Sequence, residues 1–225
     1  MILAIDTSTG QASVALAGNE GTHAETSWTA AGNHSRSLGR AVDELTMLED
    51  VELSAVSAIV VAIGPGSFSG TRVGISAGKG LALALDVPLA GVSTLDAIGF
   101  QALHGASSVT AVIPAGRGDL YCARYEGSPG EFARISGPEI VPLSRLLSDL
   151  NHAGIVAGPG SAAIVSASQQ TANQVTVQPV EMRLRRAGFL AELGRRYLEQ
   201  GGADQVDTLE PLYLRRSAAE EKRGL

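Results

Sequence analysis

Residues 6–9, Asp-Thr-Ser-Thr, form the first group in the sequence whose types and spacing could do chemistry. They lie between two apolar stretches, residues 1–5 and 13–17, so they form the turn of a predicted β-hairpin. In such a turn, backbone N–H groups and hydroxyls can hold a phosphate group, and an aspartate can position a metal ion. An ordinary Asx turn uses the same residue types. The sequence therefore leaves both a vestigial nucleotide-binding role and a structural role open for Asp6, Thr7, Ser8 and Thr9.

A second predicted hairpin, with strands at residues 109–113 and 120–125, places a comparable turn in the other half of the chain. Phosphoryl transfer between two such turns needs acidic groups from both, which hold the metal ion and activate the nucleophile. Pro114 stands where the second acid is expected, and Asp119 comes only at the start of the returning strand. This difference argues against a working kinase. The turns still leave open that the chain is a small-molecule kinase or ATPase of the actin-like superfamily, and this is the alternative to the non-catalytic function considered below.

Hydrolytic chemistry has less support in the sequence. No two of the histidines are three or four residues apart, which excludes a local helical metal site and disfavours a metallopeptidase; they are His23, His34, His104 and His152. The run Gly64, Pro65, Gly66 and Ser67 is not a Gly-x-Ser-x-Gly nucleophile elbow. We predict that this run is a structural turn that leads from a strand into a helix and presents backbone N–H groups there.

Apolar periodicity predicts the elements that position these turns. Strands are expected at residues 1–5, 13–17, 22–29, 58–63, 89–92, 109–113, 120–125 and 154–157, and helices at about 34–48, 69–85, 93–104, 143–150 and 186–200. The phrase Ala-Ile-Gly-Pro-Gly-Ser at residues 62–67 is echoed by Val-Ala-Gly-Pro-Gly-Ser at residues 156–161. Chance similarity of glycine-rich turns is one explanation of this echo, and a duplication is the other.

A duplication predicts an α/β fold of two like-folded lobes, each a mixed sheet flanked by helices. We place the N-terminal lobe at residues 1–105, the C-terminal lobe at residues 106–216, and a disordered tail at residues 217–225. Because the opening hairpin and its turn are typical of actin-like folds, the two lobes together indicate an actin-like (ribonuclease H-like) fold.

Composition limits the function classes further. The chain has 225 residues, of which 44% are hydrophobic, and a net charge of −6, so a folded core is expected and a stand-alone nucleic-acid binder is not. The densest basic stretch, residues 183–196, is either a solvated helix face or a phosphate-facing patch. The single cysteine, Cys122, excludes an intrachain disulfide. The notable apolar run, residues 58–63, is far shorter than the roughly 18 residues of a membrane span, and a cytoplasmic protein without membrane contact is expected.

Residues 64–75, GPGSFSGTRVGI, resemble the signature of the TsaB (YeaZ) family. Further matches in the same order are Ile5-Asp6-Thr7-Ser8-Thr9, His34-Ser35, Arg117-Gly118-Asp119-Leu120-Tyr121 and Pro211-Leu212-Tyr213-Leu214-Arg215. The resemblance covers nearly the whole chain. The chain differs from the family at Ser69, where threonine is usual, and at Pro114, where aspartate is frequent.

The resemblance implies an actin-like fold and a non-catalytic role. Such a protein is a scaffold and activator for the transfer of threonylcarbamoyl to N6 of adenosine 37 in tRNA. The implied partners are a catalytic paralogue, TsaD, and an ATPase, TsaE, with a homodimer when the chain is alone and tRNA contact only through the complex. No tightly bound cofactor is implied, although ATP or ADP could bind at an interface of the complex.

The predicted helix at residues 69–85 carries Gly70, Gly74, Gly78 and Ala82 at four-residue spacing, which places them on one stripe. Each glycine inside a helix costs about 1 kcal/mol relative to alanine, so a close contact should compensate. The stripe either packs on the chain's own sheet or meets a second helix, and the resemblance favours the second arrangement. We therefore predict an interface with a partner or a second copy at His34, Ser35, Leu38, Val42, Leu45, Gly70, Arg72, Val73, Gly74, Ala77 and Gly78.

Overall fold

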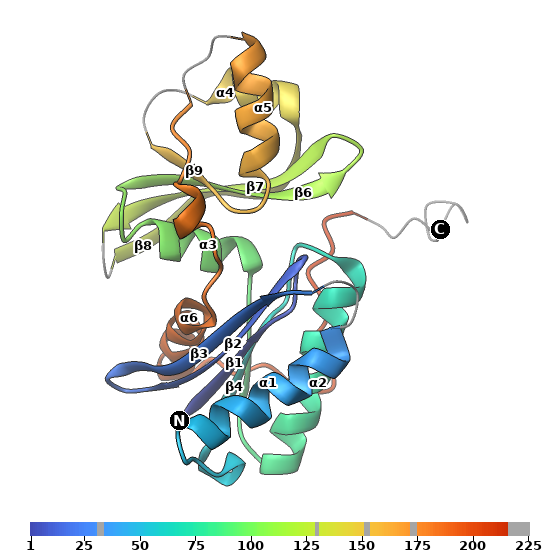
Figure 1. Cartoon of the computed structure of the whole chain (residues 1–225), viewed down its shortest axis with the longest axis vertical. Coiled ribbons are helices and arrows are strands. Elements are labelled where there is room, and N and C mark those ends of the chain that lie inside the picture. Colours follow the sequence, from blue (N-terminus) through green and yellow to red (C-terminus); the bar gives the residue numbers. More distant parts are fainter. Residues whose placement is uncertain (31–33, 129–130, 151–153, 172–174, 216–225) are drawn as a thin grey trace, which may run out of the picture. The chain divides into compact units, whose positions relative to one another are not determined.

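The computed structural model describes residues 1–30, 34–128, 131–150, 154–171 and 175–215. The chain divides into two units that are not contiguous in sequence (Figure 1). Unit 1 contains residues 1–97 and 185–212, and unit 2 contains residues 98–184 and 213–225.

Unit 1 is built on a five-stranded mixed sheet with the order β3-β2-β1-β4-β5. Its strands are β1 (Ile2–Asp6), β2 (Gln11–Gly18), β3 (Gly21–Thr29), β4 (Ala58–Ala62) and β5 (Leu89–Val92). The first three strands pair antiparallel, whereas β4 and β5 run parallel to β1. Both faces of the sheet are covered, which explains why β1 and β4 have almost continuous apolar sequences.

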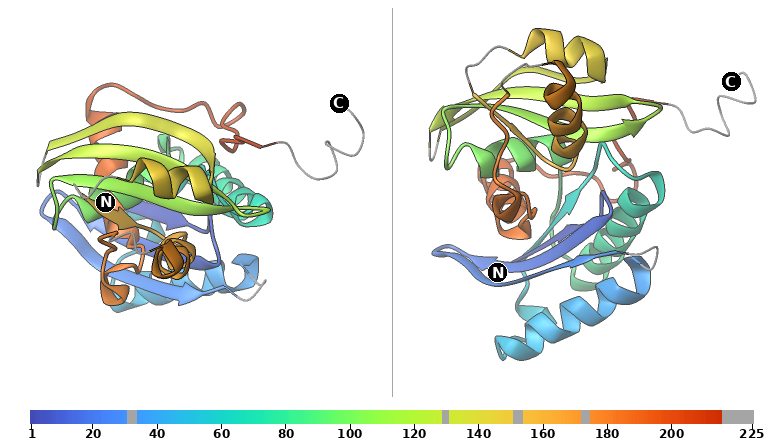
Figure 2. Two further views of the ribbon diagram at one scale, coloured as in Figure 1. Left: turned by 90° about the horizontal axis from the view of Figure 1, so that it is seen from above. Right: turned by 45° about the horizontal axis from the view of Figure 1, so that its top comes forward.

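Two helices, α1 (His34–Leu48) and α2 (Phe68–Leu85), cover one face of this sheet and lie next to each other in the right-hand view of Figure 2. Leu3 and Ile5 of β1 point into this layer, and Ala4 between them points to the opposite face. There α6 (Ala187–Glu199) packs through a stripe of small residues onto β1, β2 and β4. The alternation of side chains along each strand thus separates a bulky apolar layer from one made largely of alanine.

Unit 2 is built on a second mixed sheet with the order β8-β7-β6-β9. Its strands are β6 (Ser108–Gly116), β7 (Asp119–Ser128), β8 (Glu131–Pro142) and β9 (Ile155–Ala157). One face is covered by α4 (Leu143–Asp149) and α5 (Ser161–Thr171), with Cys122 in the core between them. The remaining elements of the described residues are α3 (Thr94–Ala102) and two short 3₁₀ turns, η1 (Leu53–Ala55) and η2 (Val180–Met182).

The two sheets share their pattern of pairing. In each, the first hairpin is extended by a third antiparallel strand on one side and by a parallel strand on the other. This repetition confirms the predicted α/β fold with two like-folded lobes, each a mixed sheet flanked by helices.

The predicted lobe boundaries need a correction. Residues 185–212 belong to unit 1 and not to a C-terminal lobe at 106–216, and residues 98–105 belong to unit 2. The physical reason is the face of α6, where Ala187, Leu190 and Ala191 fit the small side chains of the unit 1 sheet. The expected tail at residues 217–225 lies outside the described residues.

The glycine stripe of α2 faces the chain's own sheet. A Cβ atom on Gly78 would lie 2.3 Å from Val61 Cγ1, and one on Gly74 would lie 2.6 Å from Thr7 Oγ1. A Cβ atom on Gly70 would lie 2.2 Å from the carbonyl oxygen of Thr7. The prediction that these three glycines meet a partner is therefore wrong, because backbone and side chains of β1, β4 and the first turn already fill that space.

This packing predicts opposite effects for two alanine substitutions in one helix. Gly78→Ala should lower the free energy of unfolding by about 1–3 kcal/mol, because the added methyl group overlaps Val61. Gly80→Ala should raise it by about 0.5–1 kcal/mol, because nothing lies within 4 Å of its added Cβ atom and alanine favours the helix. Urea unfolding followed by Trp28 fluorescence measures both. Equal effects of the two substitutions would contradict the described orientation of α2.

Candidate functional site

The polar groups of the hairpin turn after β1 are hydrogen-bonded to other residues of unit 1. Ser8 donates two hydrogen bonds to Asp6 Oδ1, from its backbone N at 2.8 Å and from Oγ at 2.6 Å. Thr7 Oγ1 donates to the carbonyl oxygen of Gly70 at 2.7 Å, and Ser67 N donates to the carbonyl oxygen of Ser8 at 2.6 Å. All the residues of the turn, 6–9, are buried. The turn therefore lies packed beneath the first turn of α2.

Arg185 completes this turn from a distant part of the chain. Its Nε donates to Asp6 Oδ2 at 2.8 Å, one terminal nitrogen donates to Thr9 Oγ1, and the other donates to the carbonyl oxygen of Gln11 at 2.7 Å. Burial by itself raises the pKa of Asp6, but the charge of Arg185 and hydrogen bonds from Arg185 and Ser8 lower it, and the net shift is downward. The carboxylate is thus held ionised by a guanidinium.

These contacts favour the structural alternative for the turn. The side-chain oxygens of Asp6, Thr7, Ser8 and Thr9 all have partners within the chain, so none of them is directed at an open phosphate site. The binding of ATP or ADP stays a prediction. A kinase role is weakened by the same observation, because a carboxylate bound to Arg185 is not available to hold a metal ion.

Gly64, Pro65, Gly66 and Ser67 form the turn between β4 and α2. Ser67 caps the helix, since its Oγ accepts a hydrogen bond from Gly70 N at 3.2 Å. A Cβ atom on Gly66 would lie 2.0 Å from the carbonyl oxygen of Ser8, so only glycine allows the two turns to touch. The run is therefore a structural element that joins the first hairpin turn to α2.

An apolar groove of about 740 Å³ lies between α1 and α2 on the surface of unit 1. Six residues of the predicted interface line it: Ser35, Leu38, Val42, Arg72, Val73 and Ala77. Leu53 and Leu81 extend the apolar lining, and Asp43 on α1 adds a charged group. The guanidinium carbon of Arg72 lies 3.8 Å from the centre of the exposed Phe68 ring. The groove thus combines an apolar floor with one charged side chain from each helix.

The other predicted interface residues lie elsewhere. Leu45 is buried in the core and does not line the groove, and Gly70, Gly74 and Gly78 face the sheet. The side chain of His34 lies outside the described part of the structure. The prediction named the two helices that line the groove but not which face of α2 is outward. Gly39 and Gly80, which no motif singled out, also line the groove.

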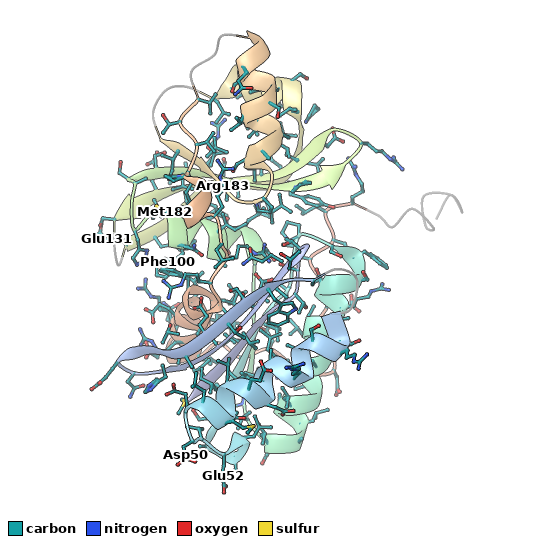
Figure 3. All side chains as sticks on the ribbon, in the orientation of Figure 1. Asp50, Glu52, Phe100, Glu131, Met182 and Arg183 are labelled. Carbon is teal, nitrogen blue, oxygen red and sulfur yellow. The ribbon has the colours of Figure 1, made fainter. Side chains whose placement is uncertain are left out.

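The arginines of residues 183–196 have partners within their own unit. Arg183, labelled in Figure 3, donates from Nε to the carbonyl oxygen of Gln178 at 2.7 Å. Arg186 pairs with Glu25 at 3.1 Å, and both Arg195 and Arg196 pair with Glu192 at 2.8 Å. These pairs favour the solvated helix face over the phosphate-facing patch.

The described residues show neither a metal site nor a reactive cysteine. No three His, Cys, Asp or Glu side chains gather there in a way that could hold a metal ion. Burial raises the pKa of the Cys122 thiol to about 11, so this cysteine is a core residue and not a reactive thiolate. Over the same described residues, no helix has the length and apolarity needed to span a membrane.

Comparison with known proteins identifies the family. Residues 28–223 match the family model described as TsaD: tRNA N6-adenosine threonylcarbamoyltransferase. The chain is 30% identical to the tRNA threonylcarbamoyladenosine biosynthesis protein TsaB of Escherichia coli (strain K12), over 98% of its own length and 97% of that protein. This chain belongs to the TsaB family. The TsaB protein of Haemophilus influenzae is 31% identical, over 98% and 96% of the two lengths.

A solved structure extends the TsaB relationship to the fold. YeaZ from Pseudomonas aeruginosa superposes with a TM-score of 0.81 at 29% identity, over 95% of this chain and 99% of that chain. The resemblance drawn from the GPGSFSGTRVGI signature is therefore confirmed over both units of this TsaB family member. The same region forms the capped start of α2 and contributes Arg72 and Val73 to the groove.

The buried pair predicts a specific loss of stability in acid. Because the pKa of Asp6 is lowered in the folded chain, its contribution is complete above the unfolded value of about 3.9 and is lost as the pH falls through the folded pKa. Asp6→Asn should cost about 3–5 kcal/mol at pH 7, because it leaves Arg185 buried without a counter-charge. Its stability should then fall less steeply than the parent's below about pH 4.

Urea unfolding at pH values from 7 down to 3 measures this difference. Glu44→Gln is the matched control, because it removes an exposed ion pair with Arg40 on α1 and should leave the profile close to the parent's. Parallel profiles for Asp6→Asn and the parent would contradict the ion-pair account.

Proposed function

We propose that this chain is a non-catalytic scaffold and activator subunit for the transfer of threonylcarbamoyl to N6 of adenosine 37 in tRNA. Its membership of the TsaB family supports the pathway. The single observation that supports the scaffold role is the apolar groove between α1 and α2, whose lining suits the apolar face of a partner helix. The proposed place of action is the cytoplasm.

The proposed occupant of the groove is a helix of the catalytic paralogue TsaD, or of a second copy of this chain when TsaD is absent. Gly39, Ala77 and Gly80 put small residues on the lining, and a Cβ atom on either glycine would meet nothing within 4 Å. A second helix can therefore approach closely and bury its apolar side chains against Val73 and Leu81. Asp43 and Arg72 supply opposite charges that can fix the orientation of that helix.

The remaining parts of the proposal concern the ATPase TsaE, nucleotides and tRNA. TsaE joins the assembly, and any ATP or ADP binds at an interface of the complex, since the first hairpin turn is occupied by Arg185. tRNA reaches this chain only through the complex. The net charge of −6 and the pairing of arginines on α6 with glutamates support this arrangement.

The groove predicts a substitution that separates binding from folding. Ala77→Glu places a carboxylate on the apolar floor and should weaken association with TsaD, or of the homodimer, by at least about thirtyfold, the effect of a binding hot spot. Leu83→Glu is the control, because Leu83 lies on the same helix, is 67% exposed and does not line the groove. Sedimentation and affinity capture with purified TsaD measure association, and thermal unfolding checks the fold. Equal binding by the two variants would refute the groove as the interface.

The non-catalytic role predicts that the isolated chain makes no product. Purified protein with ATP, threonine, bicarbonate and tRNA should form no modified adenosine, as measured by mass spectrometry of digested tRNA, until its partners are added. Formation of the modified base by this chain alone, at a rate unaffected by chelators, would overturn the scaffold role and favour an enzyme.

A further inference from the structure

Each unit closes its first hairpin turn with an arginine from a later part of the chain. In unit 1, Arg185 binds the Asp6 carboxylate and the carbonyl oxygen of Gln11. In unit 2, Arg215 binds the Asp119 carboxylate and, at 2.8 Å, the carbonyl oxygen of Ala115. Both guanidinium groups therefore join an aspartate to a backbone carbonyl of the hairpin. The arrangement occurs twice, with different residues and on different sheets, so it is a recurring feature of the fold.

The two arginines also have corresponding positions along the chain. Arg185 is the first residue of the second segment of unit 1, and Arg215 lies just after the start of the last segment of unit 2 at residue 213. The backbone of Arg185 is held as well, since its N–H donates to Gln11 Oε1 at 3.1 Å and its carbonyl oxygen accepts from Gln11 Nε2 at 3.0 Å. Each guanidinium thus binds a hairpin turn at the point where the chain enters that unit.

The unit 1 pair is closed to solvent. The side chains of Arg185 and Asp6 are 5% and 3% exposed, and every nitrogen of the guanidinium donates a hydrogen bond. The acceptors around the Arg185 guanidinium are a carboxylate, a hydroxyl and a carbonyl oxygen, one for each nitrogen. A planar guanidinium fits this set of acceptors, whereas a lysine ammonium cannot reach all three at once.

We propose that the first hairpin turn is a guanidinium-binding site whose resident ligand is the Arg185 side chain. The side chain supplies the cation that the Asp6 carboxylate needs, and in doing so it fastens residues 185–212 to β1 and β2. The turn is closed to a soluble cation as long as Arg185 occupies it. This inference goes beyond the proposed function, because it concerns what the turn binds and not which partner the chain meets.

Chemical rescue tests the site directly. Arg185→Gly should lower the melting temperature by on the order of 10 °C, because Asp6 loses its buried counter-charge. Free guanidinium at about 20 mM should restore part of this loss, since denaturation by the ion is negligible at that concentration. Sodium chloride at the same ionic strength should not restore it. Adding Asp6→Asn to Arg185→Gly should abolish the rescue, because the carboxylate is then gone.

Arg186→Gly is the matched control for rescue. Arg186 neighbours Arg185 in sequence and pairs with Glu25, but its side chain is 52% exposed. Guanidinium should leave the melting temperature of Arg186→Gly unchanged. No rescue of Arg185→Gly, or equal rescue of Arg185→Gly with and without Asp6→Asn, would overturn the proposal.

A second comparison applies if Arg185→Gly does not fold. Asp6→Asn combined with Arg185→Met leaves no buried charge at the turn, so it should melt at a higher temperature than Arg185→Met alone. Simple addition of the two single losses in melting temperature would overturn the proposal, because it would show that Arg185 and Asp6 stabilise the turn independently.

Discussion

The close approach of α2 to its sheet is the constraint on which the rest of unit 1 depends. Gly70, Gly74 and Gly78 remove the side chains that would otherwise separate the helix from β1 and β4. The helix therefore begins directly over the first hairpin turn, where Ser67 N bonds the carbonyl oxygen of Ser8. The same approach closes the turn from above, so that its aspartate needs a counter-charge from within the protein. Arg185 supplies that charge, and α6 follows directly after it.

The glycines that face the sheet also determine which side chains α2 contributes to the groove. Because α2 lies close to its sheet, Val73, Ala77 and Leu81 on its outer side line the apolar groove between α2 and the neighbouring α1. The glycines thus shape the groove through the position of the helix, although they do not line it. Their cost in helix propensity, about 1 kcal/mol each, is offset by packing against Val61 and Thr7 inside the unit.

Local patterns in the sequence predicted most of the fold but only part of the site. Alternating apolar runs identify the strands of both hairpins, and four-residue spacing identifies the stripe on α2. Spacing does not say which way a stripe faces, because a helix can bury glycines against its own sheet or against a partner equally well. Asp6 and Arg185 are 179 residues apart, so no local pattern joins them. Strand β8 was missed because most of its residues are exposed and Gly137 and Pro138 interrupt it.

The contacts of the arginines bear on whether the chain binds nucleic acid or protein. Arg185 and Arg215 are used inside their units, while Arg195 and Arg196 neutralise glutamates on α6. A chain with net charge −6 that engages these arginines internally has little positive potential with which to hold a phosphate backbone. An apolar groove does not depend on net charge, since its binding energy comes from the apolar area removed from water. We therefore expect specific binding by this chain to be protein–protein in origin, as the proposed function requires.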